Sequence, residues 1–304
     1  MKPAHTHLDT TAVALMLVLC SLWGLNQVAI KVANAGISPI LQAGLRSIGA
    51  GVLVWGWSLL RGVPLFERRD PHGAGLLVGL LFAAEFMFIY WGLVYTTASR
   101  AVILLYTSPF VVAVGAHLFV PGEKLRPAQV AGLVCAFAGV VLVFGDSLRL
   151  PTRTELIGDA MILLGAVLWG ATTVVIKATR LATIHPNKTL FYQLAVSALL
   201  LPLVSPLFGE SGITAPTPLV LGSLAFQIVI VAFASYLAWF WLMTRYSASR
   251  LASFSFFTPL FGVLAGGVLL DERISPFLLA ALALVALGIY LVNRSPSPGP
   301  VTAE

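Results

Sequence analysis

Residues 22–31 read LWGLNQVAIK, and this stretch decides the fold because the chain repeats it. Residues 168–177 read LWGATTVVIK, identical at six of ten positions and displaced by 146 residues. Two further blocks of identical residues follow in the same order. They pair Trp91, Ala98, Ser99, Arg100 and Pro109 with Trp241, Ala248, Ser249, Arg250 and Pro259 at an offset of 150, and Glu123, Pro127 and Gly139 with Glu272, Pro276 and Gly288 at 149. Three matching blocks in one order indicate an internal duplication.

The composition of the chain excludes a soluble globular protein. Of its 304 residues, 59% are hydrophobic and only 10% are charged, whereas a soluble domain has roughly 25% charged residues. Too few polar side chains remain to cover a water-facing surface. A disordered chain is excluded by the same numbers, because such chains are polar and highly charged.

Ten apolar runs in the chain are long enough for membrane helices, which need about 20 mostly apolar residues. The runs are 11–32, 40–60, 73–95, 99–119, 127–144, 158–178, 188–208, 218–243, 249–270 and 276–293. They are about twice as long as the roughly 10-residue strands of a membrane β-barrel, and they do not alternate in polarity. We therefore predict an all-α polytopic membrane protein with ten transmembrane helices.

The basic residues predict how the chain is oriented. Lysine and arginine stand singly at the ends of the apolar runs, so the net charge of +6 indicates membrane topology and not a nucleic-acid-binding patch. With the N-terminus in the cytoplasm, twelve of them fall inside and five outside. Both termini are therefore predicted to be cytoplasmic. The predicted organisation is a tail (1–10), a first five-helix repeat (11–145), a linker (146–157), a second repeat (158–293) and a tail (294–304).

The number of helices in each repeat predicts the architecture. Five is odd, so the second repeat enters the membrane from the opposite side, and the two halves are inverted. Secondary transporters use this arrangement for alternating access, with the substrate near the middle of the membrane between the halves. The repeat therefore predicts a transporter that binds a small-molecule substrate within the lipid bilayer.

Several motifs resemble those of the drug/metabolite transporter superfamily, and most closely its EamA-like branch of bacterial inner-membrane exporters. The similar segments are 90–93 (YWGL), 99–101 (SRA), 107–109 (TSP) and 121–125 (PGEKL), together with Trp-Gly in the first and sixth spans. The resemblance covers about residues 11–293. It implies export of amino acids or related amphipathic metabolites across the inner membrane. It also implies a cavity lined by spans one, three, four, six, eight and nine, with spans five and ten as scaffold.

Two charged residues fall inside predicted spans. Glu85 is the one acid well inside a span, where a charge costs roughly 2.5–3.5 kcal/mol on insertion scales. It is either a cavity residue that binds a substrate amine or a proton, and thus the proton-coupling candidate, or a carboxyl hydrogen-bonded to a neighbouring helix. Arg46 either extends its side chain to the membrane interface or serves as a counter-ion for Glu85 or a substrate carboxylate.

Aromatic and small polar residues on the expected cavity helices complete the candidate binding site. Flat aromatic walls suit a substrate with an apolar or aromatic part, and mid-membrane polar groups need partners that a wet cavity supplies. With Glu85, the predicted substrate-binding residues are Trp23, Asn26, Tyr90, Tyr106, Trp169, Thr172, Tyr236, Trp239 and Phe256. For any one of the aromatics, core packing is the competing interpretation.

Two prolines at equivalent positions, Pro109 and Pro259, interrupt spans four and nine. Each removes a helical hydrogen bond, so the pair predicts either hinges or static kinks. Small-residue pairs such as Gly132/Ala136 and Gly262/Gly266 indicate close helix packing in the scaffold, and a homodimer face is the other use they could serve.

Other function classes lack the residues that they need. No H-E-x-x-H motif or paired aspartates occur within the spans, and Cys20 and Cys135 have no metal-ligand spacing. We expect no catalytic residue, metal or cofactor. A channel would need a pore loop or filter, which is not evident. An exchanger of anionic or phosphorylated metabolites is the alternative transporter, but one mid-span arginine is few for a phosphate dianion.

Overall fold

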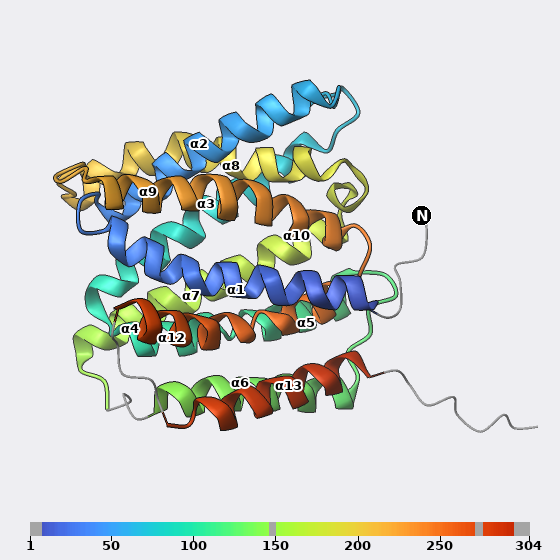
Figure 1. Cartoon of the computed structure of the whole chain (residues 1–304). Coiled ribbons are helices and arrows are strands. Elements are labelled where there is room, and N and C mark those ends of the chain that lie inside the picture. Colours follow the sequence, from blue (N-terminus) through green and yellow to red (C-terminus); the bar gives the residue numbers. More distant parts are fainter. Residues whose placement is uncertain (1–7, 146–149, 271–275, 295–304) are drawn as a thin grey trace, which may run out of the picture.

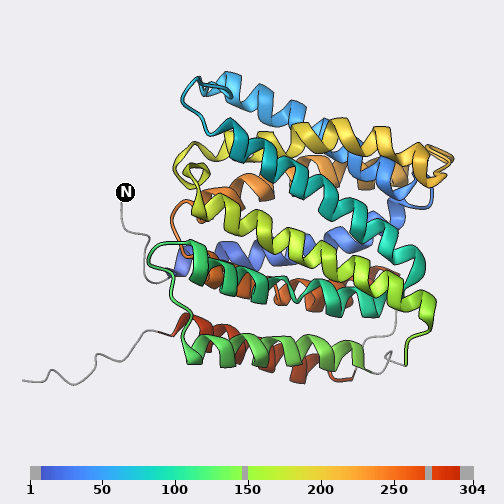
Figure 2. The same cartoon turned by 180° about the vertical axis from the view of Figure 1, so that it is seen from behind.

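The structure is a computed structural model that describes residues 8–145, 150–270 and 276–294. Within these ranges every regular element is a helix, apart from one isolated bridge between Ile37 and Ile213. The helices run side by side in layers, seen from opposite sides in Figures 1 and 2. Nine helical segments of the described chain are long and apolar enough to span a membrane, and Leu278–Asn293 is a shorter apolar helix. The prediction of an all-α membrane protein is confirmed, and the nine spans with the shorter helix are compatible with the ten spans predicted.

The predicted tails lie largely outside the described residues, as do residues 146–149 of the linker and Glu272. The first half contains α1 (Thr10–Ala33), α2 (Pro39–Leu60), α3 (His72–Tyr95), α4 (Ala98–Leu105), α5 (Ser108–Phe119) and α6 (Pro127–Phe144). The second half contains α7 (Arg153–Ala178), α8 (Pro186–Val204), α9 (Pro218–Phe226), η4 (Gln227–Ser235), α10 (Tyr236–Met243), α11 (Ala248–Phe254), α12 (Phe257–Leu270) and α13 (Leu278–Asn293), with short 3₁₀ turns η2 (Arg180–Thr183) and η3 (Ser205–Phe208).

Helix α7 begins at Arg153, inside the segment predicted as linker. Thr152 and Glu155 explain the early start because they form a capping box. The Thr152 hydroxyl accepts from the Glu155 backbone N–H at 3.2 Å, and the Glu155 carboxylate accepts from the Thr152 N–H at 2.7 Å. These two bonds satisfy amide groups that the first turn of a helix leaves unpaired.

The contacts between the halves follow the inverted repeat. α1 packs against α12, and its equivalent α7 packs against α5. The equivalent helices α2 and α8 pack together at one edge of the bundle, and α6 and α13 at the opposite edge (Figure 1). α1 begins and α13 ends on the same side of the molecule, as an even number of spans requires.

Small residues allow the closest of these contacts. A Cβ atom on Gly288 of α13 would lie 2.5 Å from the Gly132 carbonyl oxygen of α6, and one on Gly24 of α1 would lie 2.7 Å from the Gly262 nitrogen of α12. No side chain fits at such distances, so the two backbones meet directly. The small-residue pairs singled out in the sequence thus serve packing inside one chain.

Spans four and nine are each broken into two helices. α4 ends at Leu105 and α5 begins at Ser108, while α11 ends at Phe254 and α12 begins at Phe257. Pro109 and Pro259 lie in the first turns of α5 and α12, where a missing backbone N–H costs least. Span eight is also irregular, because its central segment η4 is a π-helix.

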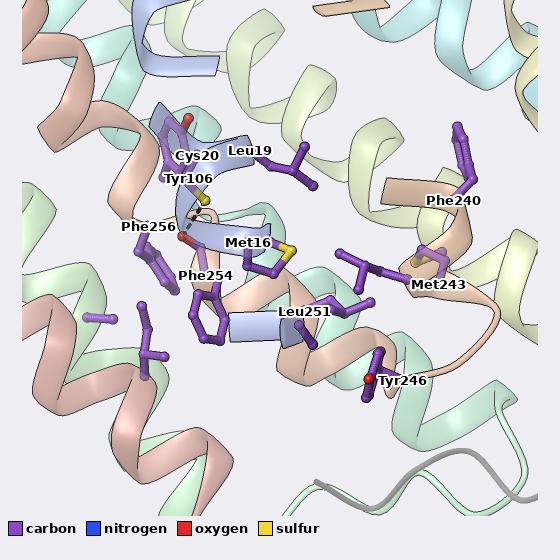
Figure 3. Packing of buried hydrophobic residues seen from close by; sticks show 14 of the residues in the cluster. Met16, Leu19, Cys20, Tyr106, Phe240, Met243, Tyr246, Leu251, Phe254 and Phe256 are labelled. Atoms are coloured by element: carbon purple, nitrogen blue, oxygen red, sulfur yellow. Dashed lines mark hydrogen bonds between the residues drawn. The ribbon is translucent and has the colours of Figure 1, made fainter. Parts of the chain in front are cut away.

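The hydrophobic core surrounds α1 near its beginning. Met16, Leu19 and Cys20 lie against the α10–α11 region, where Figure 3 shows the side chains of Leu251 and Phe254 beside them. Cys20 Sγ donates a hydrogen bond to the Phe254 carbonyl oxygen at 3.1 Å. This contact ties α1 to the break in span nine.

Candidate functional site

A cavity of about 230 Å³ lies among helices of both halves. It is near the middle of the spans, because Trp23 and Glu85 line it and each is the fourteenth residue of a 24-residue helix. Its walls come from α1, α3, α4, α5, α7, α10, α11 and α12, with additional residues from α2 and α8. No described residue of α6 or α13 lines it.

Nine of the ten predicted binding residues line this cavity. They are Trp23, Asn26, Glu85, Tyr90, Tyr106, Trp169, Thr172, Tyr236 and Trp239. Phe256 does not line it. That residue is fully buried, with its ring centroid 6.3 Å from that of Phe110 and 6.5 Å from that of Phe137. At the break between α11 and α12 its side chain packs toward the scaffold helix α6 and not toward the cavity.

Residues with unpaired buried polar atoms concentrate around this cavity. Buried polar groups in folded proteins nearly always have a hydrogen-bond partner, so exceptions require an explanation. Seven described residues carry buried side-chain polar atoms without one, and five of the seven line the cavity. These five are Asn26, Arg46, Glu85, Gln193 and Thr258. The residues that line the cavity therefore carry both donors and acceptors that no other described residue satisfies.

Arg46 of α2 does not reach the membrane interface. Its side chain is only 1% exposed and lines the cavity, so the interpretation that it extends to the interface is wrong. Its guanidinium carbon lies 4.4 Å from the Phe86 ring centroid, a cation–π contact. Its Nε and Nη2 have no hydrogen-bond partner among the described residues.

Glu85 of α3 lines the same cavity and is 6% exposed. Its Oε2 has no partner in the described part of the chain. It forms no ion pair with Arg46 within 4.0 Å, although both line the cavity. Glu85 and Arg46 are the only acidic and the only basic residues among its described lining.

Gln193 of α8 is a cavity residue that the sequence reasoning missed. A signal was present, because 37–39 (ISP) and 184–186 (IHP) share Ile-x-Pro at an offset of 147, and the same offset relates Arg46 to Gln193. The inverted repeat thus places two buried polar side chains at equivalent depths on α2 and α8. The cavity brings both together, and Gln193 Nε2 is unpaired within the described residues.

The aromatic wall of the cavity centres on Trp23. The Trp23 indole Nε1 donates to Ser235 Oγ at 2.9 Å. The Trp23 ring stands edge-on to Trp239, 5.6 Å away, and to Tyr236, 6.5 Å away. On the opposite repeat, Trp169 stands edge-on to Tyr106 at 6.0 Å. These aromatic rings form an amphipathic surface, as predicted from their helices.

The helix breaks of spans four and nine border the cavity. Ser108 beside one break and Ser255 and Thr258 beside the other line it. The proline candidates themselves, Pro109 and Pro259, are buried just behind these residues and do not line it. The breaks therefore place hydroxyl groups, and not the proline rings, at the cavity wall.

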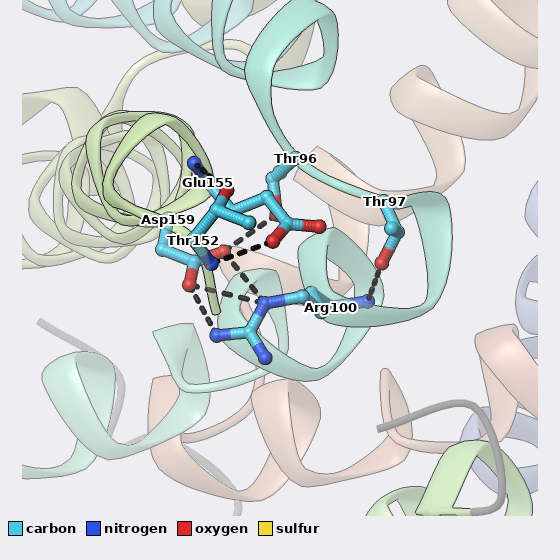
Figure 4. A network of polar contacts seen from close by, with 6 residues as sticks. All are labelled: Thr96, Thr97, Arg100, Thr152, Glu155 and Asp159. Carbon is cyan, nitrogen blue, oxygen red and sulfur yellow. Dashed lines mark hydrogen bonds and ion pairs between the residues drawn. The ribbon is translucent and has the colours of Figure 1, made fainter. Parts of the chain in front are cut away.

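Ion pairs join the two halves away from the cavity. Arg100 of α4 binds Asp159 of α7 through both Nε, at 3.1 and 3.2 Å, and Nη2, and Thr96 Oγ1 donates to the same carboxylate at 2.6 Å (Figure 4). At the other end of the bundle, Lys188 of α8 binds Asp70 at 2.9 and 3.0 Å, and also Glu67.

The ion pair with Lys188 changes the titration of Asp70. Burial alone would raise the pKa of the Asp70 carboxyl, but the hydrogen bonds from Lys188 and the Glu67 backbone N–H hold the pKa below its ordinary value. Asp70 is thus expected to be ionised over the physiological pH range.

Comparison with known proteins shows the family of this chain. Residues 10–145 and 156–294 match the model of the EamA-like transporter family. An uncharacterized transporter of Bacillus subtilis is 26% identical over 273 residues, covering 89% of this chain and 92% of that protein. A probable amino-acid metabolite efflux pump of Escherichia coli is 28% identical over 295 residues, covering 91% and 93%.

A solved crystal structure has the same fold. Its TM-score to this chain is 0.82 at 22% identity, covering 93% of this chain and 96% of the other. Together with two family matches that span nearly all of both repeats, the ten apolar helices and the central cavity lead to one conclusion: the chain is a multi-pass membrane protein that belongs to the EamA-like transporter family.

Proposed function

We propose that this protein is a secondary transporter that exports a small amphipathic zwitterion, such as an apolar or aromatic amino acid, across the bacterial inner membrane by alternating access. The observation that carries the proposal is the central cavity, whose lining residues include Arg46 and Gln193 with unpaired buried donors and Glu85 and Asn26 with unpaired buried acceptors. The termini are proposed to be cytoplasmic, from the distribution of basic residues.

Arg46 is suited to a substrate carboxylate. Nε and Nη2 form one edge of the guanidinium and can donate two parallel hydrogen bonds to a carboxylate. The chain itself contains an example, because Arg100 uses its Nε and Nη2 to bind Asp159. In Arg46 the same two nitrogens are buried and unpaired within the described residues, and the donor Gln193 Nε2 adds to the site.

Glu85 is suited to a substrate ammonium or a proton. A carboxylate at this depth is costly in lipid, and a bound cation would compensate its charge. We propose that outward transport of substrate alternates with inward transport of a proton on Glu85. The cost of burying charge would then be met in each half of the cycle by a different cation.

The size and walls of the cavity favour a small molecule. Its volume of about 230 Å³ is below the roughly 300–1,000 Å³ that is usual for drug-sized ligands. The edge-on rings of Trp23, Tyr236 and Trp239 provide apolar area for a hydrophobic side chain. A phosphorylated anion is less suited, because a dianion needs several cationic donors and Arg46 is the sole described cation in the lining.

Uptake by proteoliposomes tests this proposal. Labelled phenylalanine is compared with phenethylamine, which lacks the carboxylate, and with 3-phenylpropionate, which lacks the amine. We expect saturable transport of phenylalanine, accelerated by a proton gradient, and transport of either analogue at less than about a tenth of that rate, because a charged hydrogen bond contributes about 1.5–3 kcal/mol. Equal rates for phenethylamine and phenylalanine would overturn the role of Arg46, and rates indifferent to the gradient would overturn proton coupling.

A further inference from the structure

The equivalent tryptophans of the two repeats differ in their hydrogen bonding in this structure. Trp23 and Trp169 are equivalent by the offset of 146, and Ser235 and Glu85 are equivalent by the offset of 150. Trp23 and Ser235 form a hydrogen bond, in which Trp23 Nε1 donates to Ser235 Oγ at 2.9 Å. The equivalent bond between Trp169 and Glu85 is not formed within the described residues, and Glu85 Oε2 is buried without a partner there.

The two residues of the unformed pair lie on α3 and α7, which pack together. A Cβ atom on Gly165 of α7 would lie 3.5 Å from the Glu85 carbonyl oxygen. Trp169 is one helical turn further along the same face of α7, and helical side chains lean back toward the preceding turn. Both Trp169 and Glu85 line the cavity, so the two side chains border the same space.

The backbone also differs at the acceptor positions. Residues 227–235, which end at Ser235, are π-helical, whereas the equivalent residues 77–85, which end at Glu85, are regular α-helix. Single π-helical turns occur frequently at functional sites. This difference in backbone conformation between the repeats therefore falls at Ser235, the acceptor for Trp23, and at the equivalent residue Glu85.

We propose that the two tryptophans exchange partnership during transport: the bond from Trp23 to Ser235 marks the conformation seen here, and a bond from Trp169 to Glu85 replaces it in the oppositely facing conformation. This inference rests on the proposed alternating access, because inverted repeats interchange their conformations when the cavity changes sides. Trp23 and Trp169 are thus positioning residues for the switch. Glu85, the proposed cation site, links substrate binding to the same switch.

A cysteine reporter in the cavity measures the balance between the two conformations. Leu105→Cys lines the cavity and is introduced after Cys20 and Cys135 are replaced by Ala. A membrane-impermeant maleimide is added to one side or the other of oriented vesicles. The ratio of the two labelling rates gives the equilibrium between the conformations.

If the bonds exchange, removing one or the other should shift the labelling ratio in opposite directions. Ser235→Ala should move the labelling ratio by roughly three- to fivefold in one direction, the effect of one hydrogen bond within a membrane protein. Trp169→Phe and Glu85→Ala, each of which removes one partner of the other bond, should move it in the other direction. Adding Trp23→Phe to Ser235→Ala should change the labelling ratio little further, because Ser235→Ala already removes the bond between these two residues. Shifts in the same direction, or none, would overturn the exchange.

The same assay separates this inference from the proposed function. If the reporter without further substitution reacts from one side only, with and without phenylalanine, alternating access itself is contradicted. If it reacts from both sides but the tryptophan and acceptor variants leave the ratio unchanged, alternating access stands and the partner exchange is wrong.

Discussion

At the residue scale, the function of the site depends on where two charges point. The sequence places Arg46 and Glu85 within spans, but position along a helix does not determine which neighbours a long side chain meets. Arg46 has enough reach for the interface, yet its guanidinium packs on Phe86 beside the cavity. Its placement required the tertiary structure.

Arg46→Lys tests whether the bidentate geometry matters. Lysine keeps the positive charge but loses the paired donors, so we expect the dissociation constant for a zwitterionic substrate to rise roughly ten- to hundredfold, the value of about one charged hydrogen bond. Binding is measured by calorimetry or scintillation proximity. Arg61→Lys is the matched control, because Arg61 is exposed and stacks on Trp57. Unchanged affinity in Arg46→Lys would rule out recognition of the substrate carboxylate by paired donors on the guanidinium.

Glu85→Gln tests the proton-coupling role. The amide keeps the size of the side chain but cannot carry a proton or balance a cation, so transport driven by a pH gradient should be lost while the protein stays in the membrane. Membrane abundance is measured alongside transport. Full gradient-driven transport by Glu85→Gln would contradict the assignment, and Glu85→Asp should keep part of the activity.

Asp70 predicts a pH dependence of stability outside the membrane-spanning segments. Its pKa is lowered in the folded protein, so its ion pair with Lys188 contributes stability that is present above the unfolded pKa and is lost as the pH falls through the folded pKa. Asp70→Asn should therefore lower the free energy of unfolding at pH 7 by about 1 kcal/mol. The melting temperature should fall accordingly.

Thermal melting in detergent from pH 7 down to pH 3 checks this prediction. The difference between Asp70→Asn and the unsubstituted protein should shrink as the pH falls. Glu67→Gln is the control. It removes the other partner of Lys188, but its side chain is 56% exposed against 5% for Asp70, so its effect should be smaller. A difference that grows in acid would contradict the sign of the argument.

At the element scale, the breaks in spans four and nine are the helix interruptions that border the cavity. The sequence predicted interruptions at Pro109 and Pro259, and spans four and nine are broken there. The repeat also predicted that Phe256 would match Tyr106 in the cavity, but its ring packs on Phe110 and Phe137. Equivalence in sequence fixes the depth of a residue, whereas the local break decides which way it faces. The apolar residues of η4 contain no pattern from which its π-helical geometry could be predicted.

Pro109→Ala and Pro259→Ala test the hinge interpretation. Alanine restores a backbone N–H and favours a continuous helix, so turnover should fall by about tenfold, equivalent to roughly 1.4 kcal/mol in the barrier, with a smaller effect on substrate affinity. Single-turnover and steady-state transport separate the two quantities. Pro127→Ala, at the exposed start of α6, is the control. Unaltered turnover in both hinge variants would favour static kinks.

At the scale of the whole molecule, the repeat was the most informative feature of the sequence. Together with the ten apolar runs, it predicted inverted halves and a binding site between them, because parity depends on the whole chain and not on any one side chain. The contribution of α2 and α8, which supply Arg46 and Gln193, had only a short signal, the Ile-x-Pro shared at an offset of 147.

Trans-stimulated exchange in proteoliposomes tests the central claim most directly, because a carrier that alternates must reorient its binding site. Vesicles are preloaded with unlabelled phenylalanine, and uptake of labelled phenylalanine is followed from outside. The account predicts that preloading accelerates uptake, that uptake saturates, and that Arg46→Gln abolishes both effects. Uptake that rises linearly with concentration and ignores the preloaded substrate would contradict alternating access through this cavity.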